Sequence, residues 1–251
     1  TRMGASMDSY LNGYNDPRLP VYFQPVTDGD NKGKYRGVAN GMPNPQQEDY
    51  KAMSSPNVQE KSTDSPLRWM MASEVAFLRA EGAMRGWTAE MGGTAEEFYN
   101  KGIELSFLEN GLSADAAARY AADETSKPTD FTDVSAANTK YNISALGKIA
   151  IKWNSGASEE EQLERIITQK WIAMFPNGTE AWSEFRRTGY PRLFPVRYNY
   201  PSSGVDTNKQ IRRMVFPQSE YSNNGAAVQE AVKLLGGPDN GGTKLWWDKK
   251  N

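Results

Sequence analysis

The sequence contains neither cysteine nor histidine among its 251 residues. Without cysteine the chain has no disulfide and no thiolate nucleophile. Without histidine it lacks the general base of Ser-His-Asp and Cys-His catalysis, and it lacks the commonest zinc ligand. These two absences exclude the hydrolases and metal centres that depend on those side chains.

Long apolar runs and a surplus of positive charge are also lacking. No stretch approaches the roughly 20 apolar residues of a membrane-spanning helix. The net charge is −2 and the pI is about 5.5. This balance argues against nucleic acid as a partner, because phosphate binding needs a basic face. The length is sufficient for one domain with a sizeable core.

What the sequence does contain is helical periodicity bounded by capping residues. The pattern predicts helices over residues 67–86, 94–110, 158–174 and 179–188, and shorter ones over 1–13, 115–122 and 225–237. Three of them begin with a capping-box pair, a polar N-cap followed three residues later by glutamate: Thr94 and Glu97, Ser158 and Glu161, Asn177 and Glu180. Gly189 is expected to end the helix at 179–188 in the left-handed conformation.

The helices expected at 67–86 and 94–110 resemble a tetratricopeptide helix pair. The first begins at Ser65-Pro66, an N-cap followed by proline at the first helical position. Its apolar stripe consists of Leu67, Met70, Met71, Val75, Phe77 and Leu78. Gly102 stands in the second helix where such repeats place a small residue, which permits close helix approach. One such pair cannot bury its apolar face alone, so further helices must pack on it.

Irregular segments separate these helices. Residues 27–65 and 122–141 are rich in Gly, Asn, Asp, Thr and Pro, and the chain is irregular again after Pro191. Residues 143–153 are apolar and fit either a helix or a strand. Loops of this length in a compact protein are usually functional or disordered.

Residues 169–193, QKWIAMFPNGTEAWSEFRRTGYPRL, carry a resemblance to a known family. They resemble the most characteristic segment of SusD/RagB proteins, surface lipoproteins of the Bacteroidetes outer membrane that bind nutrients, usually glycans. Weaker similarities follow in the family's order: the DPRLP turn at 16–20, the helix from Leu67 to Glu81, and an element from Arg213 to Asn224. Phe216 stands where the family more often has tyrosine.

The resemblance implies a mainly α fold of tetratricopeptide-like helix pairs with long irregular loops. It implies that residues 1–251 are the C-terminal part of a single SusD/RagB-like domain, with the N-terminal half and the lipid anchor outside this sequence. The implied function is non-catalytic capture of a polysaccharide or oligosaccharide at the extracellular face of the outer membrane. The ligand would pass to a TonB-dependent transporter, and only the anchor would contact the membrane. No cofactor is implied.

Aromatic residues in the loops are the candidate glycan contacts. Sugar rings present flat C–H faces that pack on aromatic rings, while hydroxyl, amide and guanidinium groups supply hydrogen bonds. The candidates are Tyr22, Tyr35, Tyr50, Tyr198 and Tyr200, together with Arg36. Tyr35 is the first choice because it lies among polar and charged neighbours. The alternative for each tyrosine is that its ring pins a loop to the helices.

Other residues favour structural roles. Trp171, Trp182 and Phe185 fall at helical spacing, so core packing is expected for them. Arg186-Arg187 suits the end of a helix, with hydrogen bonds to neighbouring carbonyls, although the pair can also hold a carboxylate. Asp28 and Asp30 have calcium-binding oxygens without the spacing of an EF-hand.

Two further function classes remain open from the sequence. A tetratricopeptide-like scaffold can bind a peptide or protein without any sugar platform. A glycoside hydrolase requires two carboxylates roughly 5 to 9.5 Å apart, which a sequence cannot locate. Hydrolysis of a glycan would indicate the enzyme, and binding without turnover would indicate capture.

Overall fold

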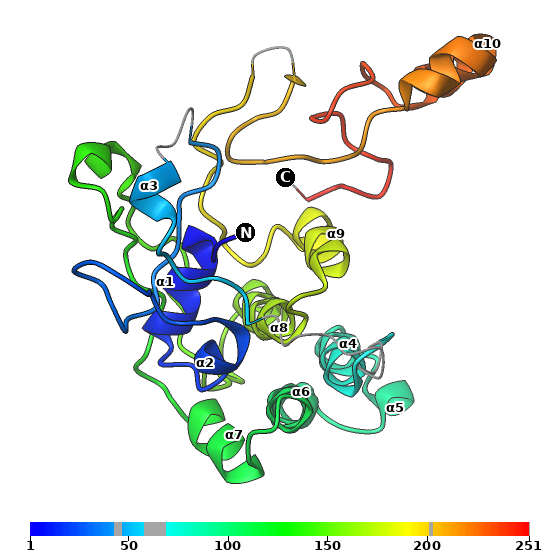
Figure 1. The fold of residues 1–251 in the computed structure, drawn as a ribbon. Helices are drawn as coiled ribbons and strands as arrows, with labels where there is room; N and C mark the ends of the chain where they lie inside the picture. Colours follow the sequence, from blue (N-terminus) through cyan, green and yellow to red (C-terminus); the bar gives the residue numbers. More distant parts are fainter. Residues whose placement is uncertain (43–46, 58–68, 201–202, 251) are drawn as a thin grey trace.

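The chain forms a helical body with long loops along one side (Figure 1). A computed structural model describes residues 1–42, 47–57, 69–200 and 203–250. Its α-helices are α1 Ala5–Gly13, α2 Leu19–Tyr22, α3 Gln47–Tyr50, α4 Ala72–Met84, α5 Thr88–Met91, α6 Ala95–Glu109, α7 Ala114–Ala121, α8 Glu159–Ala173, α9 Gly178–Thr188 and α10 Gln218–Leu234, and the 3-10 helix η1 spans Ala136–Tyr141. The described ranges contain isolated β-bridges and no strand. The prediction of a mainly helical fold is confirmed.

The main core lies where α4, α6 and α8 pack together. α4 contacts both α6 and α8, α7 packs on α6, and α9 packs on α8. The close approach of α4 and α6 depends on Gly102, because a Cβ atom there would lie 2.7 Å from the ring of Phe77. Phe77 is fully buried, so its ring cannot yield to a larger neighbour. The small residue of the tetratricopeptide-like pattern therefore has the packing role expected of it.

The buried face of α4 differs from the predicted apolar stripe. Met71 and Phe77 are buried as expected, but Met70, Val75 and Leu78 are 59%, 42% and 41% exposed. The helix instead buries small residues and two glutamates, namely Ser73, Glu74, Ala76, Ala80, Glu81, Gly82 and Ala83. Small side chains occupy most of this face of α4, and their size allows α6 and α8 to pack closely against it. The expected start at Ser65-Pro66 and the stripe residue Leu67 lie outside the described residues.

The N-cap side chains predicted at Thr94, Ser158 and Asn177 are in place, but of these three only Thr94 belongs to a complete capping box. Thr94 forms the full reciprocal box with Glu97. Ser158 and Asn177 accept hydrogen bonds from the backbone N–H groups of Glu161 and Glu180. The carboxylates of those two glutamates bind Arg165 and Lys170. Gly189 ends α9 with φ of 76°, the predicted left-handed conformation.

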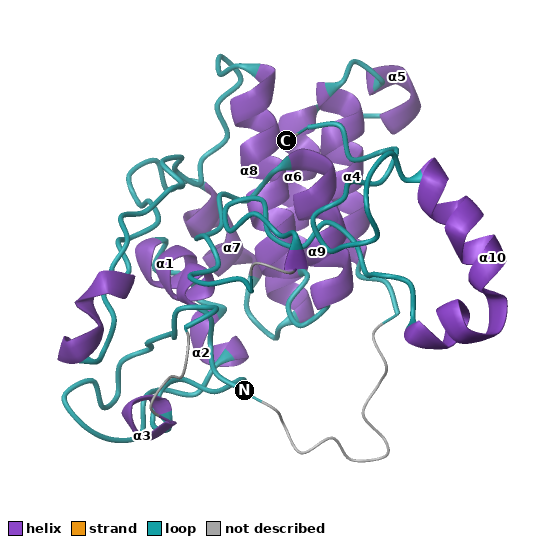
Figure 2. Cartoon of the chain, turned by 90° about the horizontal axis from the view of Figure 1, so that it is seen from above, coloured by secondary structure: helices purple, strands orange, loops and turns teal. Residues whose placement is uncertain are grey.

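Three local expectations need correction. The last helix begins at Gln218 rather than near residue 225, with non-helical dihedrals at Asn224, and it stands apart from the body (Figure 2). The first long loop contains the short helix α3. Residues 143–153 form neither helix nor strand beyond one bridge between Phe131 and Ile143.

Candidate functional site

Three long loops meet on one side of the helical body. Their described parts are residues 23–42 and 47–57, 123–145, and 192–200 and 203–210, and we call the surface where they meet the loop face. A small buried cluster beneath it takes residues from all three loops and from α1: Ala5, Ala39, Phe131, Tyr141 and Phe194. The loops that the sequence marked as candidate ligand carriers are therefore packed against one another.

Hydrogen bonds also connect these loops. The backbone N–H of Arg197 donates to the carbonyl of Asn40 over 2.9 Å. The hydroxyl of Tyr50 donates to Oδ1 of Asp133 over 2.9 Å. Each bond joins two different loops, so the two bonds hold the loops of the loop face in position relative to one another.

Tyr198 and Tyr200 are the most exposed of the six predicted contacts. Their side chains are 44% and 74% exposed, and their ring centroids are 5.5 Å apart with an interplanar angle of 78°. Asn199 lies between them in sequence, and its buried Nδ2 has no hydrogen-bond partner among the described residues. The two exposed rings are therefore the candidates for sugar contact, whereas the buried amide of Asn199 is not accessible to a ligand.

Tyr22 and Tyr50 have a different setting, because their side chains are only 4% and 6% exposed. The ring of Tyr22 packs on that of Phe175 with centroids 4.9 Å apart. Tyr50 lies in a small core cluster and holds Asp133 through its hydroxyl. In this structure both rings pin the first long loop to its surroundings, so neither offers a free face for stacking.

Tyr35 and Arg36 are intermediate. Tyr35 is half-buried against the main core. Arg36 donates from Nε to Oδ2 of Asp8 over 3.3 Å and from Nη2 to the carbonyl of Thr132. Burial raises the pKa of Asp8, and the N–H of Gly37 and the charge of Arg36 oppose that rise. Arg36 thus links the first long loop, to which it belongs, both to α1 and to the loop at residues 123–145.

An aromatic hollow of about 240 Å³ lies beside the chain's first residues and the C-terminal end of α8. Trp171, Phe175 and Phe23 line it, and Trp171 also meets Tyr10 edge-on at a centroid distance of 5.6 Å. Trp171 is therefore half-buried at the edge of the core rather than enclosed within it.

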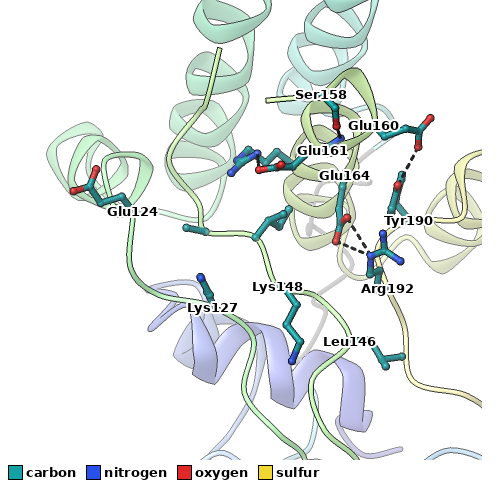
Figure 3. A pocket seen from close by; sticks show the side chains of 13 residues that line it. Glu124, Lys127, Leu146, Lys148, Ser158, Glu160, Glu161, Glu164, Tyr190 and Arg192 are labelled. Carbon is teal, nitrogen blue, oxygen red and sulfur yellow. Dashed lines mark hydrogen bonds and ion pairs between the residues drawn. The ribbon is translucent and has the colours of Figure 1, made fainter. Parts of the chain in front are cut away.

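A second hollow, of about 580 Å³, lies at the N-terminal end of α8, and we call it the charged hollow (Figure 3). Glu164 points into it, and both of its carboxylate oxygens accept from Nε of Arg192. Burial raises the pKa of Glu164, against the lowering effect of Arg192. Burial also raises the pKa of Tyr190 to about 12, helped by its hydrogen bond to Glu160. Sequence reasoning missed this hollow, because its residues come from segments far apart in the chain.

The remaining sequence candidates have structural contacts. Phe185 is buried as predicted, whereas Trp182 is half-exposed and donates from Nε1 to the carbonyl of Ile211. Arg186 lies over the ring of Trp182 at 3.5 Å and donates to the carbonyl of Arg212. Arg187 instead holds carboxylates, those of Glu81 and Glu184. In the described part of the chain, no three Asp, Glu, His or Cys side chains gather as a metal site would require, Asp28 and Asp30 included.

Comparison with known proteins decides the family. A family model described as "Susd and RagB outer membrane lipoprotein" matches residues 1–248. This chain belongs to the SusD/RagB family. No curated protein sequence matches the chain.

Several solved SusD homologues superpose on the whole chain. A chitin-binding SusD homolog from Flavobacterium johnsoniae is 43% identical, with a TM-score of 0.90 over 100% of this chain and 50% of its own. A SusD-like protein from Bacteroides thetaiotaomicron is 45% identical, with a TM-score of 0.90 over 98% of this chain and 50% of its own. A homologue from Bacteroides vulgatus is 39% identical, with a TM-score of 0.91 over 100% and 50%.

This SusD-like chain thus spans about half the length of the homologues that it matches. The family description places its members in the outer membrane as lipoproteins. None of the described helices combines the length and the apolar character needed to cross a membrane.

Proposed function

We propose that this SusD/RagB chain belongs to a cell-surface protein that captures a polysaccharide or oligosaccharide without cleaving it. The observation that carries the proposal is the 43% identity, over the whole chain, to a chitin-binding homologue. A polymer of N-acetylglucosamine is therefore the first ligand to test. Capture would occur at the extracellular face of the outer membrane, with an anchor outside this sequence, and the ligand would pass to a TonB-dependent transporter.

The loop face is the proposed place of contact. Tyr198 and Tyr200 support it best, because both rings are exposed and lie against each other. Tyr35 and Arg36 would add contacts from the first long loop. Tyr22 and Tyr50, being buried, would act on the ligand through the shape of that loop.

One feature supports capture rather than hydrolysis. Two carboxylates on α8 are paired with cations: Glu161 with Arg165 at 2.7 Å and Glu164 with Arg192 at 3.1 Å. Carboxylates neutralised in this way are poorly suited to act as a general acid and a nucleophile.

The test is isothermal titration calorimetry of the chain with chitohexaose, followed by chromatography of the same mixture after a day. The proposal expects saturable binding and intact hexasaccharide. Shorter sugars in the chromatogram would indicate a glycoside hydrolase. Absence of binding to chitohexaose and to a panel of other neutral glycans would remove the proposal and favour a peptide- or protein-binding scaffold.

A further inference from the structure

The charged hollow at the start of α8 is separate from the tyrosines of the loop face. We propose that it binds an anionic group, a carboxylate or a sulfate, carried by a sugar. This rests on the proposed function only in taking a sugar as the carrier. The anion preference itself follows from the charges that the hollow leaves unpaired. With a volume of about 580 Å³, it falls in the range of about 300–1,000 Å³ usual for ligand pockets.

The carboxylates of the hollow do not leave it acidic, because each has its own cation. Glu160 pairs with Lys250, and Glu161 pairs with Arg165 at 2.7 Å. These partners neutralise the first turn of α8, the part of the wall that would otherwise repel an anion. The same holds on the opposite wall, where Glu124 pairs with Lys152 at 2.9 Å.

Arg192 supplies the donors. Its Nε alone binds Glu164, at 3.2 and 3.1 Å from the two carboxylate oxygens. The described residues provide no hydrogen-bond partner for its Nη1 or Nη2, and the side chain is 50% exposed. The planar guanidinium fork therefore keeps two donor groups available, and this geometry matches a carboxylate or sulfate.

Two lysines add positive charge that nothing in the described structure neutralises. Lys127 and Lys148 line the hollow, and neither forms an ion pair with another described residue. Figure 3 shows both on the side of the hollow away from the glutamate-bearing turn of α8. Leu146, which is 40% exposed, lies near them and offers an apolar contact for the sugar ring.

The experiment uses a carboxylated sugar and its neutral counterpart. Calorimetry would compare trigalacturonate with the same trisaccharide as its methyl ester, and with sodium sulfate alone, at low ionic strength. The expected result is binding of trigalacturonate at least about tenfold tighter than of the methyl ester, since a charge-assisted hydrogen bond contributes about this much or more. A sulfated galactose trisaccharide replaces trigalacturonate in a parallel titration and shows which anion is preferred.

Variants assign the binding to this hollow. Lys148→Gln should weaken trigalacturonate binding several-fold, and Arg192→Gln should weaken it by about tenfold or more. Because Arg192→Gln leaves Glu164 without its cation, Lys148→Gln is the variant that leaves every ion pair of the hollow intact. Lys101→Gln removes an exposed lysine of α6 that lines neither the hollow nor the loop face, and it should leave affinity unchanged.

Equal affinity for the acid and the methyl ester would overturn the proposal, as would equal losses in the Lys148 and Lys101 variants. If sodium sulfate alone bound as tightly as trigalacturonate and the sulfated trisaccharide, the proposal would also be overturned, because the hollow would then be a site for free anions. Chitohexaose binding should persist in Lys148→Gln. Loss of the neutral ligand and loss of the anionic one are therefore measured separately, and the two proposals can fail independently.

Discussion

Asp16 and Arg18 form a doubly hydrogen-bonded ion pair that is completely removed from solvent. Nε of Arg18 lies 2.9 Å from Oδ1 of Asp16, and Nη2 lies 2.6 Å from Oδ2. Both side chains are 0% exposed. The backbone N–H of Arg18 also donates to Oδ1, which closes the turn that the DPR sequence predicted.

This pair connects the turn to the helical body. Arg18 also donates to Ser106 on α6, to Tyr120 on α7 and to Gln169 on α8. One guanidinium group therefore holds three helices and the turn in a single arrangement. The first long loop, which carries Tyr35 and Arg36 of the proposed loop face, starts directly after α2 from this anchored point.

Replacing Asp16 by alanine should destabilise the chain by about 3–5 kcal/mol, because Arg18 would remain buried without its counter-ion. Urea denaturation at neutral pH measures the change. Glu104→Ala is the control, since it breaks an exposed ion pair with Lys101 and should cost less than about 1 kcal/mol. Similar losses of unfolding free energy in the two variants would show that the buried Asp16–Arg18 pair stabilises the chain no more than an exposed ion pair does.

Gly102→Ala should destabilise by about 1–3 kcal/mol, although alanine is the better helix former. The added methyl group would meet the Phe77 ring at 2.7 Å, and the ring is fully buried. Gly225→Ala in α10 is the matched control, because nothing lies within 4 Å of its Cβ position. That change should be neutral or stabilise by about 0.4–1 kcal/mol. A stabilised Gly102→Ala would mean that α4 and α6 pack less closely than described.

Glu74→Gln should stabilise the chain near pH 7.5 and lose that advantage as the pH falls towards 4.5. Burial, and then repulsion and a hydrogen bond from Glu180, raise the pKa of Glu74 above its usual 4.5, against the charge of Lys170. A carboxyl group whose folded-state pKa is raised costs stability above that pKa and costs nothing below the unfolded value. Glutamine keeps the hydrogen-bonding shape without the charge.

Unfolding free energies at pH 4, 5.5 and 7.5 would follow this difference between Glu74→Gln and the wild type. A Gln variant that is less stable at pH 7.5 would contradict the expectation. That result would mean that attraction to Lys170, 3.8 Å away, outweighs the cost of burial.

The N-terminal ends of α6, α8 and α9 were predictable from the sequence, because a cap acts over only three or four residues. Thr94, Ser158 and Asn177 accept the predicted backbone hydrogen bonds and Gly189 ends α9, although only Thr94 of these caps completes its box with glutamate. The buried face of α4 was not predictable in the same way. It buries Glu81 because Arg187, 106 positions later in the chain, reaches back to it, and no local pattern contains that partner.

The candidate site shows the same limit. Local composition identified the loops that carry aromatic residues, and the structure brings those loops together. Local composition could not separate exposed rings from buried ones, because the exposure of a ring depends on contacts between loops. Tyr50 is buried through Asp133, 83 residues away, whereas Tyr200 is 74% exposed. Arg192 lies within the family-like segment 169–193, but the sequence does not show that Glu164 occupies its Nε and leaves the other edge of the guanidinium free.

Tyr200 and Tyr50 should therefore respond in opposite ways to substitution. Tyr200→Ala should weaken glycan binding by about 1–3 kcal/mol, by analogy with base stacking on aromatic rings. It should leave thermal stability almost unchanged, because the ring is largely exposed. Tyr50→Phe removes the hydroxyl that binds Asp133 and leaves a buried carboxylate short of a donor. It should lower the unfolding free energy by about 1–3 kcal/mol and weaken glycan binding less than Tyr200→Ala does.

Titration calorimetry with the bound glycan and a thermal melt of each variant would separate the two effects. Tyr35→Ala belongs in the same series, since its half-buried ring should show some of each effect. Unchanged affinity in both Tyr200→Ala and Tyr35→Ala would remove the loop face as the glycan site. A fall in affinity that always accompanies a fall in melting temperature would show that these rings hold the loops rather than the sugar.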